Sequence, residues 1–204
     1  MIKFIIIFSS IFFTVNASAS EAKAPFGFHW GENIQQIKSK NIILSKCKRD
    51  KSLTTCRTSK AIRNLSFAEI YALIFDSQLG LQKVMMLSKD ITDDATGNQG
   101  KKLYSKVKDS LIKKYGEPNE KFSSESSGLE LYKDYDEFYQ CLAYSGCGMW
   151  ISAWTPRGGG TIILELKGVN RGKGFLEIDY ESKNWSDIIE KRNEKQNKID
   201  SDAL

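Results

Sequence analysis

Residues 149–180 decide the fold, and they read MWISAWTPRGGGTIILELKGVNRGKGFLEIDY. Three segments in this stretch alternate apolar with polar residues or are rich in β-branched residues, and they predict strands over residues 149–155, 161–167 and 175–180. The two connections, RGGG and GVNRGKG, are rich in glycine and suit hairpins between neighbouring strands. The stretch therefore predicts an antiparallel sheet.

One long amphipathic helix is predicted before this stretch, over residues 101–115. Its apolar residues recur every three or four positions, while lysines fill the other face. Gly116 and Pro118 follow, as expected where a helix ends. Strands in runs, interrupted by one long helix, predict an α+β fold in which a mainly antiparallel β-sheet packs against that helix.

The remaining predicted elements are shorter. They are a strand over residues 26–31, a short N-terminal helix over 33–40, a hairpin of 42–48 with 53–59, a strand pair over 65–76 and 81–88, a short strand followed by a helical turn near 136–142, and a C-terminal helix from Trp185 that frays after Glu190. We expect residues 20–183 to form a single α+β domain and residues 184–204 a polar helical tail.

Residues 1–19 have the layout of a secretory signal peptide. Lys3 precedes an almost wholly apolar run over residues 4–15, and Ala17-Ser18-Ala19 supplies the small residues of a cleavage site. This run is shorter than the roughly 20 residues that span a bilayer, and no later segment is apolar enough to do so. We therefore expect a periplasmic or secreted protein, cleaved near Ala19. A buried core helix or an uncleaved anchor is the alternative.

The expected export predicts that the four cysteines form two disulfides, because an oxidising compartment favours disulfides. The expected pairs are Cys47–Cys56 and Cys141–Cys147, since the members of each pair are close in sequence and lie near turns. A structural zinc site is the alternative, but neither separation resembles the usual spacing of zinc ligands. We expect no metal and no cofactor.

Composition excludes collagen-like, coiled-coil and strongly disordered chains: the 204 residues are 41% hydrophobic and carry a net charge of +5. That small total hides an uneven distribution. Residues 38–63 hold nine basic residues and one acid, residues 101–114 hold six lysines and one acid, and residues 117–137 hold seven acids and two lysines. Such asymmetry creates a field that can steer an anionic partner.

We expect the basic hairpin to be the contact surface of a non-enzymatic binding module. Its cations are Lys46, Lys48, Arg49, Lys51 and Arg57. The expected partner is an anionic envelope component, such as lipid head groups or cell-wall polymers, or an acidic protein surface. Nucleic acid is not expected, because the hairpin has no aromatic residues for stacking and export removes the usual targets. A merely solvated lysine-rich face is the other interpretation, and the oligomeric state stays open.

Two alternative functions belong to other classes. An envelope hydrolase would use His29, the only histidine, or the carboxylates of Asp90, Asp93 and Asp94, and it requires these groups to converge on one pocket. An inhibitor or immunity protein of an exported enzyme is the other. We assign no catalytic residue, because no glycine-x-serine-x-glycine elbow is present.

The loop before the long helix is a weak candidate for an ion site. Asp90, Asp93, Asp94, Thr96 and Asn98 supply oxygen atoms, but their spacing does not match a calcium loop, and such residues also cap helices. The amides of residues 97–101 are candidates for holding an anion at the helix start. Nucleotide binding is not expected, because the spacing of a phosphate-binding loop is missing.

Several short motifs occur in a familiar order. They are FGFHWG at residues 26–31, FD at 75–76, GLQKV at 80–84, KYGEP at 114–118, and the closing strands over 161–166 and 176–180. Over residues 26–182 the chain resembles a broad group of small exported bacterial proteins. The resemblance implies a compact α+β protein of the envelope and carries over no catalytic residue.

Overall fold

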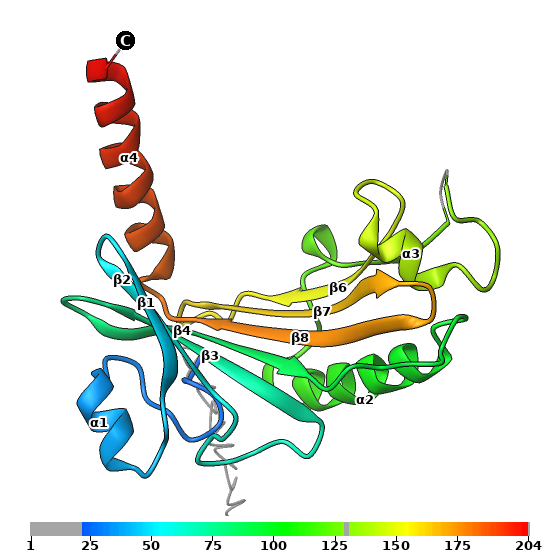
Figure 1. Ribbon diagram of the computed structural model, residues 1–204, viewed down its shortest axis with the longest axis horizontal. Helices are drawn as coiled ribbons and strands as arrows, with labels where there is room; N and C mark the ends of the chain where they lie inside the picture. Colours follow the sequence, from blue (N-terminus) through cyan, green and yellow to red (C-terminus); the bar gives the residue numbers. More distant parts are fainter. Residues whose placement is uncertain (1–21, 129–130, 204) are drawn as a thin grey trace, which may run out of the picture.

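The computed structural model describes residues 22–128 and 131–203, so the predicted signal peptide lies outside the described residues. This part of the chain has an α+β fold with one eight-stranded antiparallel sheet and four α-helices (Figure 1). In order, the elements are α1 (Ile34–Ser39), β1 (Ser45–Asp50), β2 (Leu53–Thr58), β3 (Ala68–Asp76), β4 (Gly80–Ser88), α2 (Asn98–Tyr115), the 3-10 helix η1 (Glu120–Phe122), β5 (Ser124–Ser126), α3 (Phe138–Ala143), β6 (Met149–Trp154), β7 (Thr161–Asn170), β8 (Lys173–Glu181) and α4 (Trp185–Ala203).

The sheet consists of two antiparallel meanders joined side by side. The strand order is β1-β2-β3-β4-β8-β7-β6-β5, and the pairing of β4 with β8, where Val84 lies opposite Tyr180, joins the halves. The three strands expected from residues 149–180 are present as β6, β7 and β8. Strands β7 and β8 extend further than predicted, almost to the turn at Arg171 and Gly172, where Gly172 has φ +68°. The basic hairpin β1–β2 therefore forms one edge of the sheet.

One face of the sheet carries the main core. It combines inward-facing strand residues with apolar residues of the helices, among them Leu73, Val84, Leu164, Ile178, Ile37, Tyr104, Val107 and Leu111. The hydroxyl groups of Tyr104 in α2 and Ser152 in β6 share a hydrogen bond of 2.7 Å in the buried interior. Full burial of each large aliphatic side chain contributes roughly 1.5–3 kcal/mol, so this face supplies most of the hydrophobic stabilisation.

The opposite face carries a smaller cluster and the start of α4. Ile188 of α4 is buried against Leu53 of β2 and Ile74 of β3. Beyond Ile188, α4 contacts the tip of the β1–β2 hairpin through Arg192 and Gln196 and then projects outward (Figure 1). The sequence predicted fraying after Glu190, whereas α4 is continuous to Ala203. In the described chain, no helix combines the length and the apolar character that a bilayer span requires.

The segment at residues 26–31 is a correction to the sequence prediction, because it is a pair of turns and not a strand. Phe26, Gly27 and Gly31 have φ values of +58°, +85° and +85°, which a strand does not contain. The apolar alternation of FGFHWG resembled a strand, but each positive φ reverses the chain. The result is a compact segment that contacts the loop near Ile62.

The region around residues 130–137 also differs from its prediction. The expected strand is absent from its described part, and the neighbouring sheet strand is instead β5, which pairs with β6. The expected helical turn is present as α3. Both expected disulfides, Cys47–Cys56 and Cys141–Cys147, are formed, and no described cysteine is free.

Candidate anion-binding surfaces

The basic hairpin is an exposed edge that is cross-linked to the core. All six residues of β1 are exposed, and the strand pairs only with β2. Cys56 is fully buried, so its disulfide with Cys47 fixes the edge strand to the interior. The register shifts between Ser45 and Lys48, which indicates a bulge, and Lys46 within it has φ +47°.

The five predicted cations lie on the β1–β2 hairpin and are not gathered in one cleft, and Lys51 alone among them lines the described cleft at the hairpin tip. Lys48 pairs with Thr55 and Arg49 with Thr54, so Lys48 and Arg49 point to opposite faces of the sheet. Arg57, two residues after Thr55, shares the face of Lys48. Within the described chain, Lys48 and Arg57 have no ion-pair partner, and neither does Lys46. The structure thus presents cations on both sides of an edge.

The acid within the hairpin is neutralised from elsewhere in the chain. Asp50 accepts a hydrogen bond of 2.7 Å from the guanidinium of Arg192 in α4, whose other terminal nitrogen donates to the Asp50 carbonyl oxygen at 3.0 Å. The hydrogen bond and charge of Arg192 lower the pKa of the Asp50 carboxyl group. Arg192 is therefore the main partner of Asp50, and the nearby charges of Lys51 and Lys48 act on its carboxyl group in the same direction but more weakly.

At the hairpin tip, the same helix adds cations that sequence reasoning missed. A cleft of about 480 Å³ lies between the tip and α4, and its charged lining consists of Lys51, Lys191, Arg192, Lys195 and Asp76. The Lys51 ammonium group donates to the side-chain oxygen of Gln196. The spacing of Lys191 and Lys195 places them on one helix face, but the sequence does not show that this face meets the hairpin.

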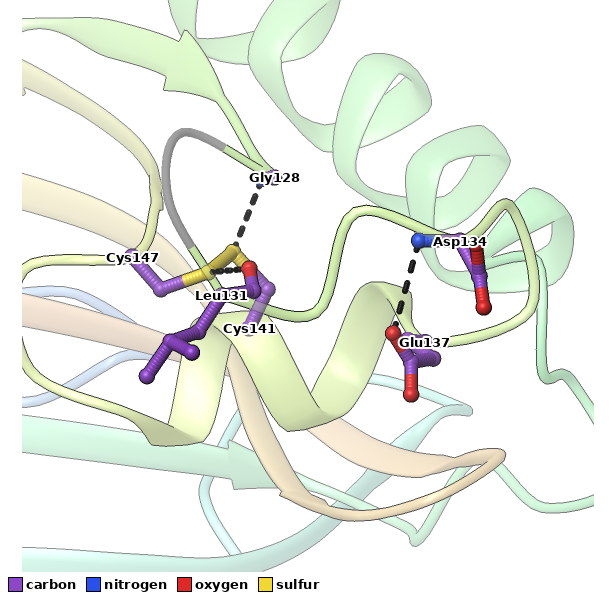
Figure 2. Close-up of a disulfide and its surroundings, with 6 residues drawn as sticks. All are labelled: Gly128, Leu131, Asp134, Glu137, Cys141 and Cys147. Atoms are coloured by element: carbon purple, nitrogen blue, oxygen red, sulfur yellow. Dashed lines mark hydrogen bonds between the residues drawn. A yellow bond between two sulfur atoms is a disulfide. The ribbon is translucent and has the colours of Figure 1, made fainter.

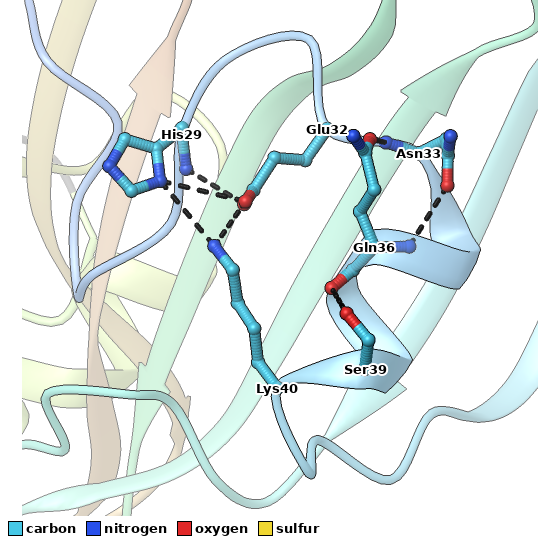
Figure 3. Close-up of polar contacts among 6 residues, drawn as sticks. All are labelled: His29, Glu32, Asn33, Gln36, Ser39 and Lys40. Carbon is cyan, nitrogen blue, oxygen red and sulfur yellow. Dashed lines mark hydrogen bonds and ion pairs between the residues drawn. The ribbon is translucent and has the colours of Figure 1, made fainter.

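His29, which is exposed, forms a small polar cluster with the partly buried side chains of Glu32 and Lys40 (Figure 3). The Nδ1 atom of His29 lies 3.5 Å from the Glu32 carboxylate, and Lys40 contacts both residues. Burial opposes the charged form of Glu32, but the hydrogen bonds from the Lys40 ammonium group and the His29 amide outweigh it and lower the pKa of Glu32. The His29 side chain is 76% exposed, and the Glu32 carboxylate forms an ion pair with Lys40.

The three candidate aspartates have separate structural surroundings. Asp94 is 5% exposed, and its carboxylate accepts from the Gly100 amide at 3.0 Å and the Tyr139 hydroxyl at 2.9 Å. Asp90 pairs with Lys173 at 2.7 Å, and Asp93 is exposed. Burial and the Asp94 hydrogen bond raise the pKa of Tyr139, so its hydroxyl keeps the proton that it donates. The Asp94 carboxylate therefore binds the Gly100 amide in the first turn of α2, which is one of the amides that the sequence suggested for an anion.

The hydrolase residues are not brought together. Lys114, near the C-terminal end of α2, lines the same cleft as His29, whereas Asp94 binds Gly100 near the other end of the helix. Gly100 and Lys114 are 14 positions apart, which corresponds to about 21 Å along the helix. In the described part of the chain, no group of three or more His, Cys, Asp or Glu side chains is placed to hold a metal ion.

The second disulfide, Cys141–Cys147, lies in a lobe of residues 131–147, which we call the stapled lobe (Figure 2). This lobe contains α3 and lies at the end of the sheet away from α4 (Figure 1). The Gly128 amide donates to Cys141 Sγ at 2.9 Å, and Cys147 Sγ lies 2.7 Å from the Leu131 carbonyl oxygen. An ion pair between Arg171 and Asp136 attaches the lobe to the β7–β8 turn. Its exposed large apolar side chains are Leu131, Tyr132, Tyr135 and Tyr144.

Comparison of the chain with protein-family models, with curated proteins and with solved structures finds no match.

Proposed function

We propose that the chain is an exported, non-enzymatic binding module that holds an anionic surface through the basic hairpin, residues 45–58. The observation that carries this proposal is the charge state of the basic hairpin. Its cations are exposed, Lys46, Lys48 and Arg57 have no carboxylate partner within the described chain, and Arg192 satisfies Asp50. A surface of this kind attracts anions over several ångströms and is sensitive to salt.

An extended anionic surface suits this edge better than a small ligand. Lys48 and Arg49 point to opposite sides of the sheet, so no single small anion contacts both. Ile43, two residues before the start of β1, is an apolar residue that is 83% exposed. A surface of anionic lipid head groups suits both the hairpin cations and the exposed apolar side chain. Basic residues bind the charged surface, and an apolar side chain enters the interface.

Export and the finer architecture belong to the same proposal. The cysteine pairs Cys47–Cys56 and Cys141–Cys147 favour an oxidising compartment, and residues 1–19 supply the expected signal peptide. We further propose that residues 20–183 act as a single domain in which α2 is the long helix that packs on the core face of the sheet. Contacts of α2 with β7 and β8 support that packing. The resemblance to small exported bacterial proteins agrees with this assignment.

Charge reversal on the hairpin tests the proposal. In sedimentation with phosphatidylglycerol vesicles, the Lys48→Glu/Arg49→Glu variant should bind at least about 10-fold more weakly than the wild type, because each basic residue near an anionic membrane contributes about 1 kcal/mol. The unfolding midpoint should not change, since both side chains are exposed. Neutral phosphatidylcholine vesicles should bind neither protein.

The matched control is Lys102→Glu/Lys106→Glu, which makes the same change of charge on exposed positions of α2. It should retain most of the vesicle binding. Equal losses in the two variants would show that only net charge matters and would refute the hairpin as the contact surface. Binding by the hairpin variant at the wild-type level would refute it as well.

A second candidate function, an inhibitor or immunity protein of an exported enzyme, is favoured by the stapled lobe. Tyrosines are enriched at protein–protein contacts, because each buries a large area with few rotatable bonds. Tyr135 is 83% exposed, and Tyr132 and Tyr144 pack edge to face with ring centroids 6.0 Å apart. The acidic residues Asp134 and Glu137 direct this surface towards a basic partner.

A further inference from the structure

A cleft on the core side of the N-terminal segment is the strongest feature that the proposed function does not use. It offers about 970 Å³ and lies between residues 23–30 and residues 62–65, with Lys40 and Lys114 completing its lining. The hairpin cations Lys46, Lys48, Arg49, Lys51 and Arg57 are not among its lining residues. The cleft is therefore a separate site from the basic edge.

The charged side chains that line the cleft are all lysines or arginines, and His29 adds an imidazole group. Lys23, Lys40, Arg63 and Lys114 come from four different segments, and no aspartate or glutamate is among the lining residues. Lys40 is held from outside the lining by Glu32. Within the described chain Lys23, Arg63 and Lys114 have no carboxylate partner, and the Lys114 ammonium group lies over the Tyr115 ring, 4.8 Å from its centroid. This convergence favours an anionic group in the cleft.

The rest of the lining is largely apolar and aromatic. Phe26, Trp30 and Leu65 contribute to it, and the indole N–H of Trp30 already donates to the Ala22 carbonyl oxygen at 2.6 Å. Trp30 therefore offers a ligand its apolar surface and no free donor. A ligand that fills such a site needs an apolar or aromatic body beside its anionic group, as in most small-molecule sites.

The backbone at Phe26 and Gly27, in the segment that lines the cleft, adopts an uncommon conformation. Phe26 has φ +58°, although it is not glycine, and its carbonyl oxygen accepts a 2.8 Å hydrogen bond from the Arg63 amide. A Cβ atom on Gly27 would lie 2.7 Å from Cβ of Ile62, so only glycine permits this close approach. The Phe26 ring packs edge to face with Tyr71 and Tyr180. A left-handed phenylalanine held by its surroundings is the kind of backbone feature that clusters at functional sites.

From the cations, the aromatic lining and the held backbone, we infer that this cleft binds a small organic anion, a phosphate or carboxylate carried on an aromatic ring. Arg63 and Lys114 receive the anionic group, and Trp30 and Phe26 contact the ring. The inference goes beyond the proposed function, because the ligand is a small molecule and the site shares no residue with the hairpin.

Phenyl phosphate is a suitable probe, titrated into the exported protein with both disulfides intact. Binding should shift the indole N–H resonance of Trp30, which the Trp30→Phe variant identifies by its loss. Phenyl phosphate should bind at least about 10-fold more tightly than inorganic phosphate or benzyl alcohol, because each of these offers only half of the complementarity. Arg63→Glu/Lys114→Glu should weaken binding at least about 10-fold, and the milder Arg63→Gln/Lys114→Gln should weaken it in the same direction.

The control is again Lys102→Glu/Lys106→Glu, which changes the charge of the same helix without touching the cleft. The hairpin variant Lys48→Glu/Arg49→Glu should also bind phenyl phosphate like the wild type, so failure of the hairpin proposal and failure of this inference are distinguishable. No shift at Trp30, or equal affinity for phenyl phosphate and inorganic phosphate, would overturn the inference. Weakening by the control variant as large as by the cleft variant would overturn it too.

Discussion

The Asp94→Ala variant is expected to lose about 2–6 kcal/mol of unfolding free energy, measured by urea denaturation. The carboxylate of Asp94 is buried and accepts from both the Gly100 amide and the Tyr139 hydroxyl. Alanine leaves two buried donors without a partner, at a cost of about 1–3 kcal/mol each. The loss should also loosen α3, because Tyr139 belongs to that helix.

Asp90→Ala is the matched control, since the same residue type is removed four positions earlier. Asp90 is exposed and its pair with Lys173 is half-exposed, so this change should cost less than about 1 kcal/mol. If the two variants were equally stable, the assignment of Asp94 as a structural group would fail. The hydrolase alternative, in which Asp94 is a free catalytic carboxylate, would then regain its best candidate.

The Gly168→Ala variant is expected to be equally severe, with a loss of about 3 kcal/mol or more. A Cβ atom on Gly168 would lie 1.8 Å from the Tyr139 carbonyl oxygen and 2.8 Å from the Ala143 amide nitrogen. Both are backbone atoms of α3, so relief requires the helix to move away from β7, and overpacking of this kind costs 1–3 kcal/mol or more. The measurement is the urea midpoint, together with amide exchange in α3.

Gly146→Ala provides the comparison within the stapled lobe. Nothing lies within 4 Å of a Cβ atom at Gly146, but its φ is +88°, so the change costs only the strain of a left-handed alanine, about 1–2 kcal/mol. A Gly168→Ala protein as stable as the Gly146→Ala protein would contradict the close packing of α3 on β7.

The elements with strong local patterns were predictable from the sequence. Strands β6, β7 and β8 have β-branched alternation and glycine-rich turns, and α2 has a clear apolar stripe closed by Gly116. The pairing of Cys47 with Cys56 followed from their positions on two strands of one hairpin. Local patterns succeed here because the sheet is built from consecutive antiparallel strands, so sequence neighbours are usually spatial neighbours.

The FGFHWG segment was mispredicted because alternation is not specific for strands. Aromatic residues and glycines alternate at residues 26–31, but positive φ at Phe26, Gly27 and Gly31 folds the segment into turns. The turn at Phe26 and Gly27 packs closely against Ile62, which is 35 positions away from Gly27 in the sequence. A pattern within six residues does not contain that contact, and the cleft that the segment lines was missed for the same reason.

The candidate site was predictable in composition but not in arrangement. The count of basic residues identified the hairpin, whereas the bulge at Lys46 decides which cations share a face. The pairing of Asp50 with Arg192 joins residues 142 positions apart, and nothing in the local sequence of either residue indicates it. An aspartate just before a helix is compatible both with capping and with ion binding, so the sequence does not distinguish the two roles of Asp94. The hydrogen bond from the buried Tyr139 hydroxyl, which only the structure shows, identifies Asp94 as a structural group.

Lysine footprinting of the wild-type protein tests the central claim most directly. Acetylation rates are measured by mass spectrometry for the protein alone, with neutral vesicles and with phosphatidylglycerol vesicles, and the lysines elsewhere on the chain serve as internal controls. If the hairpin is the contact surface, the anionic vesicles should slow modification of Lys46, Lys48 and Lys51 several-fold while leaving Lys102 and Lys106 unchanged. Unchanged rates at the three hairpin lysines, with protection falling instead on Lys133 in the stapled lobe or on Lys23 and Lys114 in the cleft, would contradict the account.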